Sequence, residues 1–230
     1  MNSSSPSSFS KVLKLITIDG PSASGKSSVS REVAKRLGWS WVSTGVFYRG
    51  IAYVALTLGV SADDEPGLLK ILNTKDWSVE MATEQTIFRY MKGDVTPKLR
   101  QEEIGAVASQ VSTISSVRQA LLSAQQDCFI RSPQGLVAEG RDCGTVVFPQ
   151  ASLKIYLTAK TTDRARRRAK EEGKTIKETK AYVSSRDRSD QGREAAPLQV
   201  PPGSTVVDTT SMPLESVIVQ VLGLAQKRFL

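Results

Sequence analysis

One stretch decides the fold of this chain: Gly20-Pro21-Ser22-Ala23-Ser24-Gly25-Lys26-Ser27. It fits the pattern G-x-x-x-x-G-K-[ST], in which glycines let the backbone fold closely around an anion and point its N–H groups at phosphate oxygens. Before it, residues 14–18 form a short apolar run that predicts a buried strand. After it, apolar residues recur every four positions from Val29 to Leu37, and Gly38 follows as a helix C-cap. The motif therefore lies between a strand and a helix N-terminus, where a phosphate-binding loop belongs.

The positions of this loop have separate chemical roles at a nucleotide. Its backbone N–H groups and the positive end of the helix dipole bind phosphate oxygens. The ammonium group of Lys26 reaches the β- and γ-phosphates, and the hydroxyl group of Ser27 is the predicted ligand of Mg²⁺. The predicted nucleotide-binding residues of this part of the chain are Gly20, Pro21, Ser22, Ala23, Ser24, Gly25, Lys26, Ser27 and Ser28.

The composition is that of a soluble globular protein with an anionic partner. The 230 residues are enough for one α/β domain with insertions. The 31 basic residues exceed the 23 acidic ones, and the net charge of +8 favours the phosphates of a small molecule or of a nucleic acid. Cys128 and Cys143 show neither metal-ligand spacing nor a disulfide framework, so we expect a cytoplasmic protein.

The sequence contains no histidine, and this excludes several kinds of active site. A histidine base, a Ser-His pair and a His-zinc site are ruled out, whereas phosphoryl transfer relies mainly on positioning and charge stabilisation. No apolar run approaches the roughly 18 residues of a membrane span, so we expect no membrane partner. The Ser-rich start lacks an apolar segment, and we expect residues 1–12 to be a disordered tail rather than a signal peptide.

Strand and helix patterns alternate along most of the chain. The predicted strands lie at residues 14–18, 39–43, 136–138, 153–157 and 204–208. The last helix begins at Pro213 and carries its apolar residues on one face. This alternation predicts an α/β fold with a parallel five-stranded sheet, helices on both faces, and loops at the carboxyl ends of the strands that meet at the phosphate-binding loop.

Two segments interrupt this alternation. Residues 60–103 contain two alternating runs, 77–81 and 86–90, joined by a polar link. They predict a β-hairpin, and so a small inserted α+β subdomain. Residues 160–193 hold 12 of the basic residues against six acidic ones and few apolar side chains, so we expect this segment to be solvated and mobile.

Several arginines stand at predicted strand ends and in loops. They are Arg49, Arg141, Arg186 and Arg193. A lone arginine is usually a solvated surface charge. Several of them beside a nucleotide site indicate bound phosphate, because guanidinium groups bind phosphate in a bidentate way and stay protonated.

Longer stretches carry a family resemblance. The most discriminating is Glu139-Gly140-Arg141-Asp142-Cys143-Gly144-Thr145-Val146-Val147-Phe148-Pro149. The others are residues 17–22, 44–49, 108–111, 117–118, 186–187, 190, 193 and 196–198. From about residue 14 to the C-terminus the chain resembles the bacterial cytidylate (CMP) kinases, members of the nucleoside monophosphate kinase family. The resemblance implies a P-loop kinase domain over residues 13–230 that transfers the γ-phosphoryl group of ATP to CMP or dCMP with Mg²⁺. It also implies a monomer that takes small molecules and not nucleic acid.

The resemblance also implies roles for single residues. The arginines named above would gather around the acceptor phosphate, Ser109, Arg118 and Asp142 would read the cytosine edge, and Asp190 would hold the ribose hydroxyls. A carboxylate, an arginine and a hydroxyl suit the amino donor and the ring acceptor of cytosine. The implied substrate-binding residues are Thr44, Gly45, Tyr48, Arg49, Ser109, Arg118, Arg141, Asp142, Arg186, Asp190 and Arg193. The implied catalytic residues are Lys26, Arg141, Arg186 and Arg193.

The two interrupting segments have counterparts in that family. Residues 60–103 match an inserted subdomain that binds the nucleoside monophosphate, and residues 160–193 resemble a lid that closes over ATP. Arg164 and Arg168 are the implied lid contacts of ATP. The sequence departs from the family pattern at four places. Ser27-Ser28 stands where many members have Gly-Thr, and Ser43-Thr44 replaces a common Asp-Ser, so that Ser27 and Thr44 still supply hydroxyl groups. Glu139 replaces an aspartate at a strand end, and Gln191 replaces a frequent arginine.

Three alternatives stay open from the sequence. A kinase of the same fold could act on UMP, AMP or a non-nucleotide acceptor. An RNA-binding NTPase would suit the net charge, but the basic segment 160–193 contains a single aromatic residue, Tyr182, for stacking on bases. A non-catalytic nucleotide-binding module is disfavoured by the intact Lys26 and Ser27.

Overall fold

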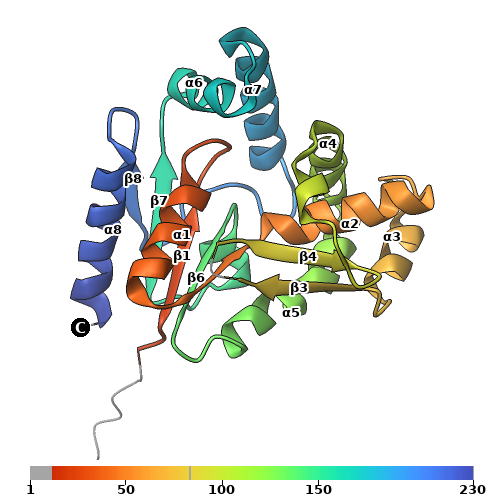
Figure 1. The fold of residues 1–230 in the computed structure, drawn as a ribbon, viewed down its shortest axis with the longest axis horizontal. Helices are drawn as coiled ribbons and strands as arrows, with labels where there is room; N and C mark the ends of the chain where they lie inside the picture. The colour runs from red at the N-terminus through yellow and green to blue at the C-terminus, as the bar shows by residue number, and fades with distance from the viewer. Residues whose placement is uncertain (1–11, 83, 230) are drawn as a thin grey trace, which may run out of the picture.

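A parallel sheet forms the centre of the molecule. The computed structural model describes residues 12–82 and 84–229, so the predicted tail, residues 1–12, lies outside the described residues except for Val12. The sheet has the strand order β2-β6-β1-β7-β8, and all neighbouring pairs are parallel. The strands are β1 (Leu15–Asp19), β2 (Ser40–Ser43), β6 (Leu136–Gly140), β7 (Leu153–Thr158) and β8 (Thr205–Asp208). The predicted five-stranded parallel sheet is confirmed (Figure 1).

Helices cover both faces of this sheet. Every residue of β1 is buried, and successive side chains of a strand point to opposite faces. Leu15 belongs to a core shared with α2 (Gly45–Leu58) and α5 (Ser115–Ile130). Ile16 and Ile18 belong to a second core shared with α1 (Lys26–Leu37) and α8 (Leu214–Phe229). The continuous apolar run of β1 is therefore explained by burial on both sides, as predicted.

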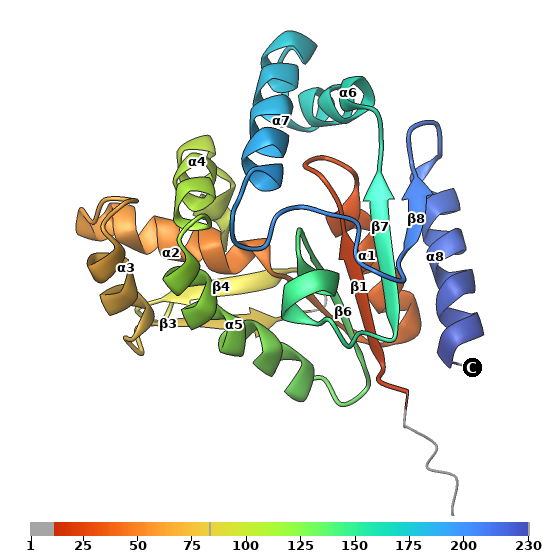
Figure 2. The ribbon, with the colours of Figure 1, turned by 180° about the vertical axis from the view of Figure 1, so that it is seen from behind.

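A smaller antiparallel sheet lies beside α2. Its strands are β3 (Trp77–Met81), β4 (Thr86–Tyr90) and β5 (Gly93–Asp94). The hairpin predicted at residues 77–81 and 86–90 is confirmed with these bounds. The neighbouring elements are α3 (Glu65–Leu72), a 3₁₀ turn η1 (Thr96–Arg100) and α4 (Glu102–Val111). Phe88 of β4 belongs to the same core as α2, so this segment packs against the main domain (Figure 2).

Two helices stand over the carboxyl ends of the strands: α6 (Thr161–Glu172) and α7 (Ile176–Gln191) (Figures 1 and 2). Thr175 begins α7 with a capping box, in which its side chain accepts from the Glu178 N–H and the Glu178 side chain accepts from the Thr175 N–H. The basic segment 160–193 is thus largely helical. A π-helical turn, η2 (Cys143–Val147), follows β6. In the described part of the chain, no helix is both long and apolar enough to cross a membrane.

Gly50 lies in the middle of α2, where this helix meets β4. A β-carbon at Gly50 would come within 2.1 Å of Cε2 of Phe88. Phe88 is fully buried, and its ring is stacked on Trp77 with the centroids 5.7 Å apart. This close approach explains why glycine stands in a helix interior, where alanine has the higher helix propensity.

We expect Gly50→Ala to lower the free energy of unfolding by about 1–3 kcal/mol, because the added methyl group overpacks against Phe88. The matched control is Gly223→Ala in α8, where nothing lies within 4 Å of the added β-carbon. This variant should raise the free energy of unfolding by about 0.5–1 kcal/mol. Urea unfolding measures both, and stabilisation by both substitutions would contradict the contact between α2 and β4.

Candidate active site

A cavity of about 320 Å³ lies among the carboxyl ends of the central strands, α2, α4 and α7. Its volume falls in the range of small-molecule sites. It is lined by these predicted residues: Ser22, Ala23, Lys26 and Ser27 of the loop, and Thr44, Gly45, Tyr48, Arg49, Arg141, Asp142, Arg168, Arg186, Asp190 and Arg193. The chain therefore gathers most of the predicted residues at one place, although they come from segments far apart in the sequence.

Some predicted residues do not line this cavity. They are Gly20, Pro21, Ser24, Gly25, Ser28, Ser109, Arg118 and Arg164. Gly20 and Gly25 have positive φ angles of 151° and 90°. A β-carbon at Gly20 would lie 2.1 Å from the carbonyl oxygen of Leu157 on β7, so only glycine lets the loop pass this close to the sheet. The contribution of these glycines is therefore the path of the backbone.

Lys26 begins α1 and points back into the loop. Its side chain is buried, and Nζ donates a hydrogen bond to the carbonyl oxygen of Pro21 at 2.7 Å. Burial and, less strongly, the positive charge of Arg141 lower the pKa of Lys26 to about 7, while the negative charge of Glu139 opposes the shift. A phosphate anion at this place would restore the charged form, because an opposite charge nearby favours it.

Asp19 lies directly beneath the loop and ties it to the turn that follows β6. The Asp19 carboxylate accepts hydrogen bonds from the backbone N–H of Cys143 at 2.8 Å and of Gly144 at 2.7 Å. Burial raises the pKa of Asp19 to about 7 even though these two bonds act to lower it. The bonds hold the end of β1 against the turn that carries Arg141 and Asp142, and so connect two parts of the cavity.

Ser27 and Glu139 place two side-chain oxygen atoms next to each other in the cavity. The Ser27 hydroxyl donates to Oε1 of Glu139 at 2.9 Å, and both residues line the cavity. Mg²⁺ is usually held by one or two protein oxygens together with substrate phosphates and water, not by a complete protein cage. The described residues contain no group of three or more His, Cys, Asp or Glu that could hold a metal on its own. This pair fits a Mg²⁺ ion that arrives with a nucleotide.

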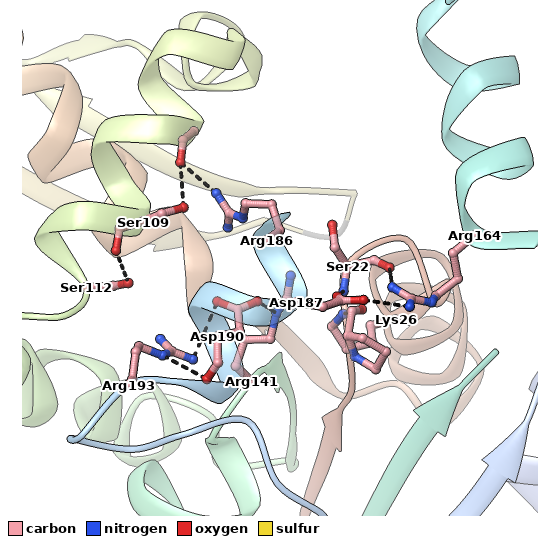
Figure 3. Close-up of polar contacts among 12 residues, drawn as sticks. Ser22, Lys26, Ser109, Ser112, Arg141, Arg164, Arg186, Asp187, Asp190 and Arg193 are labelled. Atoms are coloured by element: carbon pink, nitrogen blue, oxygen red, sulfur yellow. Dashed lines mark hydrogen bonds and ion pairs between the residues drawn. The ribbon is translucent and has the colours of Figure 1, made fainter. Parts of the chain in front are cut away.

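Backbone carbonyl groups hold two of the predicted arginines. Nη1 of Arg49, on α2, donates to the carbonyl oxygen of Leu99 at 2.5 Å. Nη1 of Arg186, on α7, donates to that of Gly105 on α4 at 2.6 Å (Figure 3). A guanidinium group has five N–H donors, so these bonds fix its orientation and leave donors for a ligand. Burial lowers the pKa of Arg49, and the positive charge of Arg186 adds to this shift. A bound anion would offset the repulsion between these two cations.

Asp190 holds the other two predicted arginines (Figure 3). Nε of Arg141 donates to Oδ2 of Asp190 at 2.7 Å, and Nη2 of Arg193 lies 3.6 Å from Oδ1. Burial opposes ionisation of Asp190, but the charges of Arg141 and Arg193 outweigh it and lower the pKa of this carboxyl group. Asp190 is therefore an anion that fixes two cations at the edge of the cavity.

Arg118 and Asp142 form a buried ion pair at the far end of the cavity. Arg118 also donates from Nη1 to the carbonyl oxygen of Ser112 at 3.0 Å, and its guanidinium carbon lies 5.3 Å from the ring centroid of Tyr48. Asp142 lines the cavity and Arg118 does not. Arg118 thus orients Asp142, whose remaining lone pairs can accept from a ligand.

Ser109 does not line the cavity, and its predicted role stays a prediction. Its hydroxyl donates to the carbonyl oxygen of Gly105 at 3.0 Å. Ser112, one turn further along, lines the cavity instead and donates to the carbonyl oxygen of Ser109 at 2.8 Å (Figure 3). Sequence reasoning missed Ser112, although three-residue spacing places it on the same face of the segment as Ser109. The sequence does not show that α4 ends at Val111, and so does not place Ser112 in the cavity.

The guanidinium group of Arg164 makes its hydrogen bonds to other residues of the chain. Its guanidinium group donates to the carbonyl oxygens of Ala159 at 3.0 Å and of Ser22 at 2.9 Å, and it pairs with Oδ2 of Asp187 at 2.6 Å. Oδ1 of Asp187 accepts from the N–H of Ser22 at 3.3 Å. The base of α6 and the end of α7 are thereby fastened to the phosphate loop (Figure 3).

Comparison with protein families gives one match over almost the whole chain. The model of the family described as cytidylate kinase matches residues 16–227. A protein of Bdellovibrio bacteriovorus named cytidylate kinase is 52% identical over 204 residues, which are 89% of this chain and 94% of that protein. One of Azotobacter vinelandii, with the same name, is 41% identical over 90% of this chain and 93% of that protein.

Solved structures with the same fold are much less similar in sequence. The crystal structure of TT1252 from Thermus thermophilus has a TM-score of 0.52 at 15% identity, covering 96% of this chain and 100% of that chain. That of a gluconokinase from Sinorhizobium meliloti 1021 has a TM-score of 0.50 at 14% identity, covering 93% of this chain and 91% of that one. At such identities the likeness shows the fold alone, which is the predicted P-loop kinase fold.

The lowered pKa of Lys26 predicts proton uptake when a nucleotide binds. Between pH 7 and the ordinary pKa near 10 the free site holds Lys26 mostly neutral, and bound phosphates raise this pKa. We expect binding of Mg·ATP to take up most of one additional proton at pH 8 and little at pH 6, where Lys26 is already charged. Calorimetry in buffers of different ionisation enthalpy measures the uptake.

The matched control for this titration is Lys26→Arg, which keeps the charge at every pH. It also keeps Asp19, so any uptake by that carboxyl group is common to both proteins. The wild type should therefore exceed the variant at pH 8 and match it at pH 6. Equal uptake by the two proteins at pH 8 would show that Lys26 is already charged in the free site.

Proposed function

The chain belongs to the cytidylate kinase family and is a kinase that transfers a phosphoryl group from ATP to CMP; we propose that the transfer takes place in the cavity described above, with Mg²⁺ as cofactor and with dCMP as a second acceptor. ATP would lie with its phosphates in the loop of residues 20–27. CMP would lie between α2, α4 and the end of α7.

One observation supports this assignment: six cationic side chains from different segments line the same cavity, and four of them are assigned to the phosphates. Lys26 comes from α1, Arg49 from α2, Arg141 from the end of β6 and Arg186 from α7. Two nucleotides placed end to end bring several negative charges together, and a transferring phosphoryl group spreads charge over its oxygens. Cations that are already oriented stabilise this charge without reorganising during the reaction.

The acceptor supplies its own nucleophile. A phosphate monoester is largely anionic near neutral pH, so an oxygen of the CMP phosphate can attack the γ-phosphorus in line without a protein base. We assign the acceptor phosphate to Arg49, Arg141 and Arg186. Their anchoring bonds to Leu99, Asp190 and Gly105 leave other N–H donors for it.

The cytosine edge is assigned to Asp142 and Ser112, with Arg118 positioning Asp142. The carboxylate accepts from the exocyclic amino group of cytosine, whereas the carbonyl group at the same place on uracil would meet it as a second acceptor. The hydroxyl groups of Ser109 and Ser112 each donate to a backbone carbonyl group and keep lone pairs that can accept from the cytosine amino group, so Ser109 keeps its predicted role beside Ser112. Asp190 is assigned to the ribose hydroxyls, since two arginines do not use all the lone pairs of a carboxylate.

The Ser27 hydroxyl would hold Mg²⁺, and Glu139 would order one of its water ligands. The ion would supply positive charge at the β- and γ-phosphates. The residues of the chain do the rest: Lys26 binds the same phosphates, and the loop N–H groups orient them.

We further propose that residues 160–193 act as a lid and residues 60–103 as the inserted subdomain. Closure of α6 and α7 would exclude water, so that the phosphoryl group passes to CMP and not to solvent. The support is that α7 already reaches across to α4 through Arg186 and Gly105, and that Arg168, on α6, lines the cavity. The cytoplasmic location and the monomeric state stay predictions.

A panel of acceptors tests the assignment of the base. ADP production is followed with CMP, dCMP, UMP, AMP and shikimate. We expect kcat/KM to be highest for CMP, with dCMP accepted. Asp142→Asn should narrow the preference for CMP over UMP about tenfold or more, because an amide can donate to uracil. A preference of the wild type for AMP would contradict the assignment of the cytosine edge. No ADP production with any of these acceptors would favour a non-catalytic binding module.

A further inference from the structure

Tyr182 lines the cavity and has no role in the assignments above. It lies on α7 one turn before Arg186, so the two side chains share a face of that helix. The hydroxyl oxygen of Tyr182 is buried and has no hydrogen-bond partner among the described residues. Buried hydroxyl groups are nearly always hydrogen-bonded. The hydrogen-bond partner of the Tyr182 hydroxyl group is therefore expected to be a ligand bound in the cavity.

The ring of Tyr182 is fixed from one side by Arg168. The guanidinium carbon of Arg168 lies 4.1 Å from the ring centroid, which is a close cation–π contact. The same guanidinium group pairs with Oε1 of Glu172 at 2.6 Å. The contact joins α6 to α7 inside the basic segment. The place of the Tyr182 ring therefore depends on how α6 packs against α7.

The hydroxyl group of Tyr182 faces α4 at Gly105. A β-carbon at Gly105 would lie 3.2 Å from the Tyr182 hydroxyl oxygen and 3.1 Å from Nη2 of Arg49. The carbonyl oxygen of the same glycine accepts from Nη1 of Arg186. Three polar groups from α2 and α7 thus converge where α4 has no side chain. The absence of a side chain at Gly105 gives them this space.

The surroundings of the hydroxyl group select an anion as its partner. Arg49, Arg168 and Arg186 lie near it and all three line the cavity, whereas Glu172, which is paired with Arg168, does not line it. The buried Nε of Arg186 also lacks a partner among the described residues. A phenol group can donate one hydrogen bond, and a phosphate oxygen is the strong acceptor that would satisfy it together with the free arginine N–H groups.

We propose that the Tyr182 hydroxyl donates a hydrogen bond to the phosphate of CMP, between Arg49 and Arg186, and that its ring positions Arg168 for ATP. Tyr182 is then a substrate-binding residue of this chain with two separable functions. The inference rests on the proposed acceptor site. It also explains why the one aromatic residue of the basic segment 160–193 lies inside the cavity and not on its surface.

Tyr182→Phe separates the two functions, because it removes the hydroxyl and keeps the ring beside Arg168. We expect the KM and the calorimetric Kd for CMP to rise about tenfold, which is typical for the loss of a hydrogen bond to a charged group. The KM for ATP and the melting temperature should stay unchanged. Tyr182→Leu removes the ring as well, so it should also raise the KM for ATP.

The matched control is Tyr53→Phe. Tyr53 is on α2, and its hydroxyl group accepts from Nζ of Lys98 at 3.2 Å outside the cavity, so the kinetic constants should not change. An unchanged KM and Kd for CMP in Tyr182→Phe would overturn the proposal, and so would an effect on ATP alone. If the wild type itself did not phosphorylate CMP, the proposed function would fail first. The wild-type reaction thus tells the two failures apart.

Discussion

Repulsion between the phosphates of two nucleotides is the constraint on which the rest of this structure depends. Two unit charges 4 Å apart interact by about 4 kcal/mol at the effective dielectric constant typical near a protein surface, and each nucleotide brings more than one charge. In the proposed site, Lys26, Arg49, Arg141 and Arg186 offset this repulsion; they come from different segments and line one cavity only after folding. The topology of the sheet makes this possible, because the carboxyl ends of parallel strands converge on the phosphate loop.

Such a group of cations repels itself before a ligand arrives, and the structure shows how this is managed. Asp190 fixes Arg141, and backbone carbonyl groups hold Arg49 and Arg186. Lys26 is partly neutral near pH 7, because its pKa is lowered to about 7, mainly by burial. The cations are thus oriented in advance while their full charge is needed only when phosphate is bound. This is the preorganisation that electrostatic catalysis requires.

The parts of this design that depend on local sequence could be predicted from the sequence. The loop of residues 20–27 is fixed by its glycines and its flanking apolar runs, and the hairpin of β3 and β4 by strict alternation. The direction of a side chain could not be predicted where it depends on residues far away in the sequence. Whether Ser109 or Ser112 faces the cavity depends on where α4 ends, and Arg164 turns inward because Asp187 and Ser22 offer it acceptors. The proposed role of Tyr182 could not be predicted from the sequence, because its neighbours Arg49 and Gly105 are brought to it only by tertiary packing.

The most direct measurement is a crystal structure of the enzyme with CMP, Mg²⁺ and a non-hydrolysable analogue of ATP. The account predicts that Arg49, Arg141 and Arg186 lie about 2.7–2.9 Å from oxygens of the CMP phosphate, and that Lys26 exchanges the carbonyl group of Pro21 for the phosphates of the analogue. Arg141 and Arg186 facing bulk solvent, with neither ligand in reach, would contradict it.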